Sequence, residues 1–312
     1  MTIPQQRALL ESRGMEIADA PKADEYLQRI GYYRLSAYWY PFRKVVQQQD
    51  GSFALGNEFK PGTQFKHATD LYAFDKGLRL LVLDAIERIE ISVRTEVALS
   101  IGRHDPRAHR NPALLDKRFT TAKNPAFADS MHAGWLKKLD DRSASSKEEF
   151  ADHFRAKYPG ENMPVWIAVE LLDFGPLSYF LSGMRYSDIQ MVSASYGGLR
   201  PHLIKSWTRS LSVIRNVCAH HSRLWNKPLV DQPALPSQGE IPELDHLLQM
   251  AGANRRLYAA LAIMRVLLKG INPRTNWADR LRVHMATFPV APNIKIGHAG
   301  FPANWTDLPL WN

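Results

Sequence analysis

Residues 203–226, LIKSWTRSLSVIRNVCAHHSRLWN, join a helical apolar pattern to a cluster of polar side chains. Apolar residues return at three- and four-residue steps through the first half of this stretch, at Leu203, Ile204, Trp207, Leu211 and Ile214. Such spacing predicts a helix with one buried face. Because the pattern stops at Ile214, we expect the residues after it to lie at the end of that helix.

The polar cluster begins where the apolar pattern stops. It places Arg215, Asn216, His220 and His221 within seven residues. On a helix, Arg215 and His220 would point about 140° apart, so they converge only if the helix ends, bends or meets a second copy of itself. A permanently charged Arg beside a His suits proton transfer next to a phosphate. The alternative is a polar helix terminus whose histidines face the C-terminal dipole and whose arginine is solvated.

The composition is that of a folded protein with a sizeable core. Of the 312 residues, 45% are hydrophobic and 23% are charged. We expect no membrane span, because no apolar run is long enough and the N-terminus lacks a signal core. The single cysteine, Cys218, fits a reducing cytoplasm. The net charge of +9 favours an anionic partner, with nucleic acid as the first candidate.

The N-terminal part reads as two helices over residues 5–30, with a turn at 13–15, followed by the aromatic segment GYYRLSAYWYPFR at 31–43. This segment could stack on unpaired bases and hold phosphates, with Arg34, Tyr38 and Arg43 as the RNA contacts. The alternative is an aromatic layer that packs the N-terminal helices onto the body. Residues 44–65 predict loops, with room for a short hairpin.

The longest helical pattern runs from about residue 69 to 100. Its polar residues Asp84, Glu87, Glu90 and Arg94 fall within a sector of about 120°. In a functional interpretation, Glu87 or Glu90 orients Arg215 or a histidine. The alternative is ordinary pairing on a helix surface, since Glu90 and Arg94 are four residues apart.

The rest of the chain predicts further helices and loops. Strand-like alternation is nearly absent and no fixed repeat occurs, so the predicted class is all-α. We expect an irregular excursion at 102–130 and a basic flexible connection at 137–147, followed by helices at 148–157 and 166–173. A sharp corner at 174–178 then leads to helices at 177–184 and from 187, a Pro-rich loop at 231–242 and a helix at 254–269. The chain ends in an apolar tail, which we expect to dock on the body or a partner.

Other chemistry finds little support in the residues. His104 and His109 lack the spacing of a zinc motif, so we expect no metal site there. The absence of a Gly-rich phosphate loop leads us to predict no cofactor. Cys218 could be read as a nucleophile with its base, but residues two apart on a helix point about 200° away from each other. A small buried packing group is the better interpretation of Cys218.

Several segments, taken together, resemble the Abi-like (AbiD/AbiF) family of bacterial abortive-infection proteins, within the HEPN superfamily. Arg215, followed by Asn216 and then His220, is similar to the R-x(4–6)-H motif of that superfamily. The other matching segments, in order, are GYYRLSAYWYPF at 31–42, LRLL at 78–81, ERIE at 87–90, RT at 94–95, VW at 165–166, FGPLS at 174–178 and GFPANW at 300–305.

The resemblance implies a HEPN-type helical bundle. We expect an N-terminal helical extension at 1–65, a helical domain at 66–270 with an insertion at about 102–160, and a C-terminal tail at 271–312 that packs on the body. It also implies a cytoplasmic homodimer in which two copies of the motif line one composite cleft.

The implied activity is metal-independent RNA cleavage by attack of the 2′-hydroxyl on its own phosphodiester. His220 would be the general acid or base, Arg215 would hold the phosphate, and Asn216 would position either group. His221, Glu87, Glu90 and Arg94 are auxiliary candidates, and Arg223 is a further phosphate contact.

Two alternatives remain open. The protein could be a non-catalytic RNA-binding or regulatory module with a dormant motif, held in complex with an antitoxin that is a protein or an RNA. It could also be a purely structural helical protein, which would leave the charge of +9 without a partner.

Overall fold

The computed structural model describes residues 1–123 and 129–312 and confirms an all-α fold. Its described residues contain one sheet, an antiparallel pair of strands. The α-helices and strands are α1 (Ile3–Ser12), α2 (Ala20–Ile30), α3 (Tyr32–Trp39), β1 (Arg43–Gln47), β2 (Phe53–Phe59), α4 (Phe65–Gly102), α5 (Lys117–Thr121), α6 (Met131–Ser145), α7 (Glu149–Lys157), α8 (Val165–Ala168), α9 (Phe174–Ser182), α10 (Tyr186–Ala194), α11 (Pro201–Ala219), α12 (Leu257–Ile271) and α13 (Trp277–Met285).

Short 3₁₀ helices connect these elements. They are η1 (Tyr40–Phe42), η2 (Ala108–Arg110), η3 (Pro112–Leu114), η4 (Val169–Leu171), η5 (Pro242–Gln249), η6 (Ala253–Arg255), η7 (Ile296–Ala299), η8 (Trp305–Asp307) and η9 (Pro309–Trp311). Within the described ranges, no helix is both long enough and apolar enough to cross a membrane.

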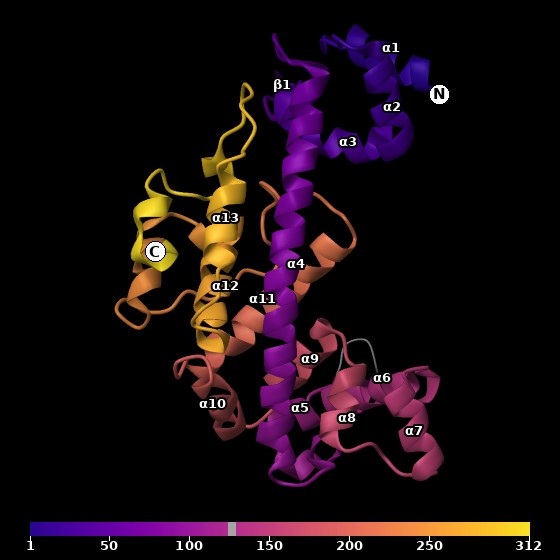
Figure 1. Cartoon of the computed structure of the whole chain (residues 1–312), viewed down its shortest axis with the longest axis vertical. Helices are drawn as coiled ribbons and strands as arrows, with labels where there is room; N and C mark the ends of the chain where they lie inside the picture. The colour runs from indigo at the N-terminus through magenta and orange to yellow at the C-terminus, as the bar shows by residue number, and fades with distance from the viewer. Residues whose placement is uncertain (124–128) are drawn as a thin grey trace.

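Helix α4 is the axis of the molecule (Figure 1). Its 38 residues extend over about 57 Å. The N-terminal elements lie at one end and α5 to α9 at the other, while α12 and α13 run beside it. A helix of this length forms here because its buried positions recur at helical spacing and no proline interrupts it, as at Leu78, Val82, Ile89, Val93 and Val97.

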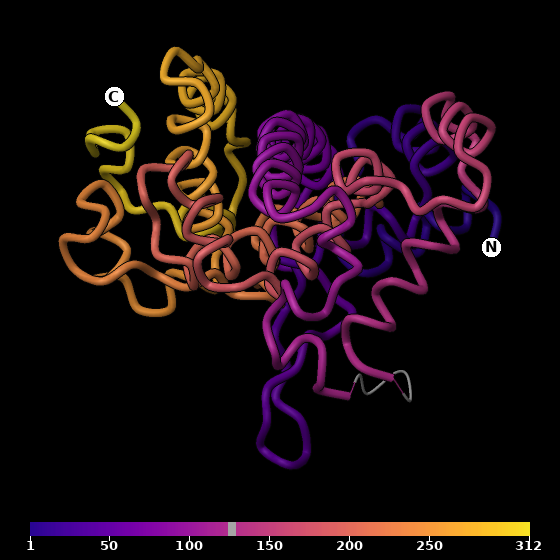
Figure 2. Tube along the Cα trace, turned by 90° about the horizontal axis from the view of Figure 1, so that it is seen from below, coloured from indigo at the N-terminus to yellow at the C-terminus, as the bar shows by residue number. Residues whose placement is uncertain are grey.

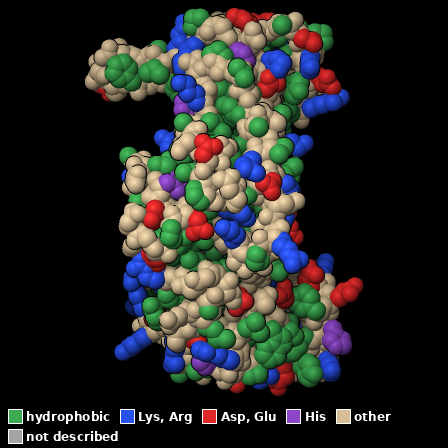
Figure 3. Space-filling view, turned by 60° about the vertical axis from the view of Figure 1, so that its left-hand side comes forward, with side chains coloured by type: hydrophobic (Ala, Val, Ile, Leu, Met, Phe, Trp, Pro, Cys, Tyr) green, Lys and Arg blue, Asp and Glu red, His purple; other side chains and the backbone are tan. Residues whose placement is uncertain are grey.

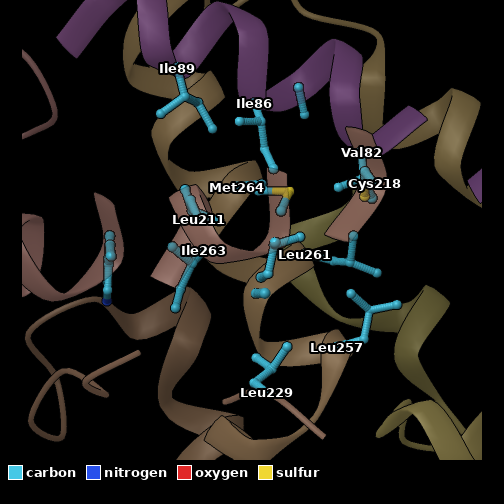
Figure 4. Close-up of a cluster of buried hydrophobic side chains, with 14 of the residues drawn as sticks. Val82, Ile86, Ile89, Leu211, Cys218, Leu229, Leu257, Leu261, Ile263 and Met264 are labelled. Atoms are coloured by element: carbon cyan, nitrogen blue, oxygen red, sulfur yellow. The ribbon is translucent and has the colours of Figure 1, made fainter. Parts of the chain in front are cut away.

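The central core joins α4, α11 and α12 (Figure 4). Val82 and Ile86 of α4 lie with Leu211 of α11 and with Leu261 and Met264 of α12, and all five are buried. Burial of each such side chain contributes about 1.5–3 kcal/mol. The apolar face predicted for 203–214 is therefore confirmed, and its packing on α4 leaves the polar end of α11 at the surface.

The N-terminal segment packs as the aromatic layer that the sequence offered as one alternative. Leu35, Tyr38, Trp39 and Phe42 are buried, whereas Tyr33 is 89% exposed. The hairpin that was allowed for residues 44–65 is present as β1 and β2. It projects from the body in Figures 2 and 3 and carries three exposed apolar side chains, Val45, Val46 and Phe53.

The C-terminal tail docks on the body, as predicted. Trp277, Phe301, Trp305 and Trp311 are all buried. Two of these indoles are also held by hydrogen bonds, since Trp277 Nε1 donates to the Leu81 carbonyl at 2.9 Å and Trp311 Nε1 donates to the Tyr258 hydroxyl at 3.1 Å. The tail is thus part of the core and includes the helix α13.

Three local predictions were wrong. The corner expected at 174–178 is the first part of α9, because Pro176 sits in the first turn, where a helix needs no N–H donor. The flexible connection expected at 137–147 is mostly helical: Ser130 caps α6, and Trp135 and Leu139 are buried. The helix expected over 166–173 is only the short α8 followed by η4.

Candidate active site at the end of α11

Helix α11 ends within the motif. The Ser222 amide donates to the Val217 carbonyl and the His221 amide to the Cys218 carbonyl, both at 3.0 Å. This pair of bonds is the Schellman arrangement, in which the residue after the cap adopts the left-handed conformation. His221 occupies that position with φ 56°, and His220 is the cap. The helix therefore stops between Arg215 and His220. A helix end at this point was one of the three ways in which the sequence allowed the two side chains to converge.

A buried carboxylate fixes the chain directly after the histidines. Asp75 of α4 accepts hydrogen bonds from the Leu224 amide at 3.0 Å and the Trp225 amide at 2.6 Å. It also accepts from the Tyr38 hydroxyl at 2.8 Å and from Arg79 at 2.5 Å. Buried amides need partners, and a charged acceptor is a strong one. Asp75 thereby anchors the loop that begins at His220.

Arg215 lies on the side of α11 that faces α4. Its guanidinium is 3.9 Å from a carboxylate oxygen of Glu90 and 3.9 Å from one of Asp173. The side chain remains one-third exposed. Together with Glu87, Glu90 and Arg94 it lines a pocket of about 560 Å³. Both ion pairs are long, so the guanidinium retains donors for an incoming anion.

Glu90, one of the acidic residues of α4, forms an ion pair close to Arg215. Glu90 accepts from Arg94 at 3.0 Å, which confirms the pair expected from their spacing, and Arg94 also donates to the Leu172 carbonyl at 2.8 Å. Burial raises the pKa of Glu90, although Arg94 and Arg215 oppose that shift. Glu90 thus supplies a partly desolvated acceptor that orients both arginines. Glu87 is exposed at the rim of the same pocket.

The other side of the motif faces α3. The Arg34 guanidinium donates to the His221 carbonyl at 2.8 Å, and Arg223 donates to the Ala37 carbonyl at 2.6 Å. A second pocket, of about 500 Å³, lies here between α3 and the loop after α11. His221 lines it, whereas Arg215 lines the first pocket.

The predicted site residues therefore separate into two neighbourhoods. Arg215, Glu87, Glu90 and Arg94 share one pocket, and Arg34, His221 and Arg223 share the other. Asn216 and His220 are exposed between them. Among the described residues, no hydrogen bond or ion pair joins Arg215 to His220, although the amide oxygen of Asn216 accepts from Arg215 at 3.4 Å.

Two RNA contacts expected from the sequence have other partners. Tyr38 is only 1% exposed, so its ring cannot stack on a base, and its hydroxyl is bonded to Asp75. That prediction was wrong because the aromatic segment serves the core first. Arg43 lies in neither pocket, since it donates to the Gly56 carbonyl at 2.6 Å and to Asn57 at 2.8 Å within the hairpin.

Sequence reasoning missed Asp75 and Arg79. Both are buried, and both lie on the apolar face of α4. A signal was present, because an Asp and an Arg four residues apart on an otherwise apolar face must be paired. The sequence did not indicate which groups Asp75 binds, because the two backbone amides that donate to it lie about 150 residues further along the chain.

The remaining candidates are structural. Cys218 is fully buried, and burial raises its pKa to about 12, which argues against a thiolate nucleophile. His104 pairs with Asp188 at 2.8 Å. Burial lowers the pKa of His109 to about 4. Across 1–123 and 129–312, no group of three or more His, Cys, Asp or Glu side chains is placed to hold a metal.

Comparisons with known proteins place the chain in a family. A family model described as "Abi-like protein" matches residues 25–226, well over half of the 312 residues. The match begins in α2 and ends just past the motif, at Asn226, so it includes α4, α11 and every residue that lines the two pockets except Lys227. No curated protein and no solved structure matched the chain. The chain therefore belongs to the Abi-like protein family.

Proposed function

We propose that the protein is a metal-independent endoribonuclease of the HEPN type, acting in abortive phage defence or in a toxin–antitoxin pair. The observation that carries this proposal is the end of α11. There an arginine and a histidine are both accessible. The Schellman bonds fix the helix end that includes His220, and Asp75 anchors the chain that follows it. A fixed constellation of a cation and an acid–base group at the surface suits cleavage of a large, anionic substrate.

In the proposed reaction, His220 removes the proton of a ribose 2′-hydroxyl as its oxygen bonds to the neighbouring phosphorus. The bond from phosphorus to the 5′-oxygen breaks, and that oxygen receives a proton from an imidazolium. Arg215 donates to the non-bridging oxygens, where negative charge accumulates. The products carry a 2′,3′-cyclic phosphate and a 5′-hydroxyl, and neither metal nor cofactor enters the balance.

A second copy of the chain would supply the second imidazole. Arg215 lines one pocket, whereas His220 is exposed and lines neither, so a two-fold partner is the simplest way to bring both groups to one phosphate. Helix α4 offers a face for such a partner. Leu80, Ile91 and Leu99 are 60%, 52% and 59% exposed along it, and Leu80 and Ile91 line the pocket that contains Arg215. Burial of these side chains would favour association.

The resting contacts of Arg215 are compatible with this role. Glu90 and Asp173 hold the guanidinium at 3.9 Å each, which orients it without saturating its donors. A phosphate can therefore bind without breaking a short ion pair. Asp173 has a partner of its own, because Arg142 contacts it at 2.6 Å.

The test compares substitutions along a single helix. Arg215→Ala and His220→Ala should each lower RNA cleavage by at least about a hundredfold while the protein remains folded. Arg209→Ala and His202→Ala are matched controls, because both residues are exposed on α11 and lie away from its C-terminal end. Cleavage that survives in both motif variants contradicts the proposal. RNA that is retained but never cut would favour the RNA-binding alternative.

A further inference from the structure

The pocket beside His221 has the composition of a ligand site. It is formed by α3 and η1 on one side and by the loop after α11 on the other. Tyr33, Arg34, Tyr40, Arg223 and Lys227 line it with His221. Its volume of about 500 Å³ is large enough for a nucleotide-sized group.

The charges around this pocket are unbalanced. Its described lining residues include no Asp or Glu. Within the described part of the chain, none of Arg34, Arg223 and Lys227 forms an ion pair. Asp75 acts on Arg223 from below, but that carboxylate is fully buried and already accepts from Arg79. Three cations around one hollow attract an anion.

Among these cations, Arg223 gives the strongest evidence for an anion site. Its guanidinium is half-buried, and burial lowers its pKa, but its hydrogen-bond partner is a neutral carbonyl, that of Ala37. An arginine stays charged in a protein, so this charge is partly desolvated, and Asp75 acts on it without forming an ion pair. An anion in the pocket would supply the missing partner.

The aromatic side chains add a second kind of contact. Tyr33 is 89% exposed at the mouth of the pocket, and Tyr40 is 47% exposed with the Arg43 guanidinium over its ring at 5.7 Å from the centroid. Tyr33 has an edge contact with Tyr32, at 5.8 Å between ring centroids. Exposed tyrosines beside unpaired cations are the pattern by which proteins hold single-stranded nucleic acid.

We propose that this pocket binds one unpaired nucleotide of single-stranded RNA, with its phosphate on Arg223 and Lys227 and its base on Tyr33. Because His221 lines the pocket, the bound nucleotide lies next in sequence to His220, the proposed acid–base group. The inference rests on the proposed nuclease for its biological meaning. The pocket would then select single-stranded over double-stranded substrates, since a paired base cannot reach Tyr33.

Binding can be measured without cleavage. The probe is a short, fluorescently labelled 2′-O-methyl oligoribonucleotide, which lacks the attacking hydroxyl, titrated with the full chain at several salt concentrations. Tyr33→Ala should weaken binding about tenfold through lost stacking. Lys227→Gln should weaken binding and reduce the slope of log Kd against log salt by about 1. A duplex of the same sequence should bind the wild type more weakly than the single strand.

Matched controls come from elsewhere on the surface. Tyr186 is 67% exposed at the start of α10, and Lys117 is exposed at the start of α5. Tyr186→Ala and Lys117→Gln should bind like the wild type. The inference is overturned if Tyr33→Ala and Lys227→Gln also bind like the wild type, or if the wild type retains no oligonucleotide. The nuclease proposal fails by a different measurement. It is contradicted when Arg215→Ala and His220→Ala still cleave RNA, whereas the pocket is tested by binding of an oligonucleotide that cannot be cleaved.

Discussion

The Arg34 guanidinium donates a 2.8 Å hydrogen bond to the carbonyl of His221, across 187 residues of sequence. This bond ties helix α3 to the residue that follows the cap of α11. The N-terminal segment is therefore coupled to the candidate site, because the same bond that fixes His221 also fixes one wall of the RNA pocket.

Replacement of Arg34 should loosen the motif without unfolding the protein. Arg34→Met keeps the aliphatic stem and removes the donor, so the loop at 221–223 loses one restraint. We expect faster amide hydrogen exchange at Ser222 and weaker RNA binding. Arg29→Met is the control, since Arg29 is 76% exposed and pairs with Glu25 of its own helix. Equal exchange at Ser222 in Arg34→Met and wild type would show that the bond restrains nothing.

Because His221 has a left-handed backbone conformation, substitutions there can distinguish the role of its backbone from the role of its imidazole. His221→Gly should be more stable than His221→Ala by about 1 kcal/mol, because only glycine adopts φ 56° without steric cost. Urea denaturation measures the difference. With the backbone preserved, His221→Gly should retain more cleavage than His220→Ala. The reverse order of activity would assign the acid–base role to His221.

Loss of the Asp75 carboxylate should be severe. Asp75→Asn removes the charge that balances buried Arg79 and leaves too few acceptors for four donors. We expect a loss of about 3–5 kcal/mol in the free energy of unfolding. Adding Arg79→Met should recover part of that loss, since it removes the unbalanced charge. Additive losses in the double variant would mean that the two side chains act independently.

The buried His109 predicts how stability depends on pH. Its pKa falls from the usual 6.5 to about 4 in the folded protein, so the unfolded chain binds the proton first as the pH drops. Stability is therefore present above pH 6.5 and lost as the pH falls toward 4, by about 2 kcal/mol between pH 7 and 5. Urea denaturation at the two pH values measures it. His109→Leu should show a loss smaller by that amount, and an unchanged pH dependence would contradict the assignment.

Association through α4 predicts a change in mass. Ile91→Glu places a charge on the exposed face that includes the Arg215 pocket, and should shift a dimer toward monomer in light scattering. Cleavage should fall with the dimer fraction. Val283→Glu is the control, because Val283 is 70% exposed on α13. A wild type that is monomeric when it binds and cuts RNA would remove the composite site from the mechanism.

The sequence predicted those features that depend on local periodicity. The length of α4, the apolar face of α11 and the buried tail all follow from hydrophobic spacing. The Glu90–Arg94 pair follows from helical geometry in the same way. These features needed no knowledge of which elements meet.

The remaining features depend on contacts between distant segments. Asp75 could not be assigned to the loop at 224–225 because tertiary packing alone joins them. Tyr38 and Tyr33 belong to one aromatic run, but the helix α3 buries the first and exposes the second. The left-handed His221 was also hidden, since glycine is the residue that normally marks such a helix end.

The chemistry of the cleaved ends tests the central claim most directly. Purified protein is incubated with single-stranded RNA in EDTA, and the product termini are identified by mass spectrometry. Attack by the 2′-hydroxyl predicts 2′,3′-cyclic phosphate and 5′-hydroxyl ends, which disappear in both Arg215→Ala and His220→Ala. Cleavage that requires a divalent metal, or products with 5′-phosphate ends, would contradict the account.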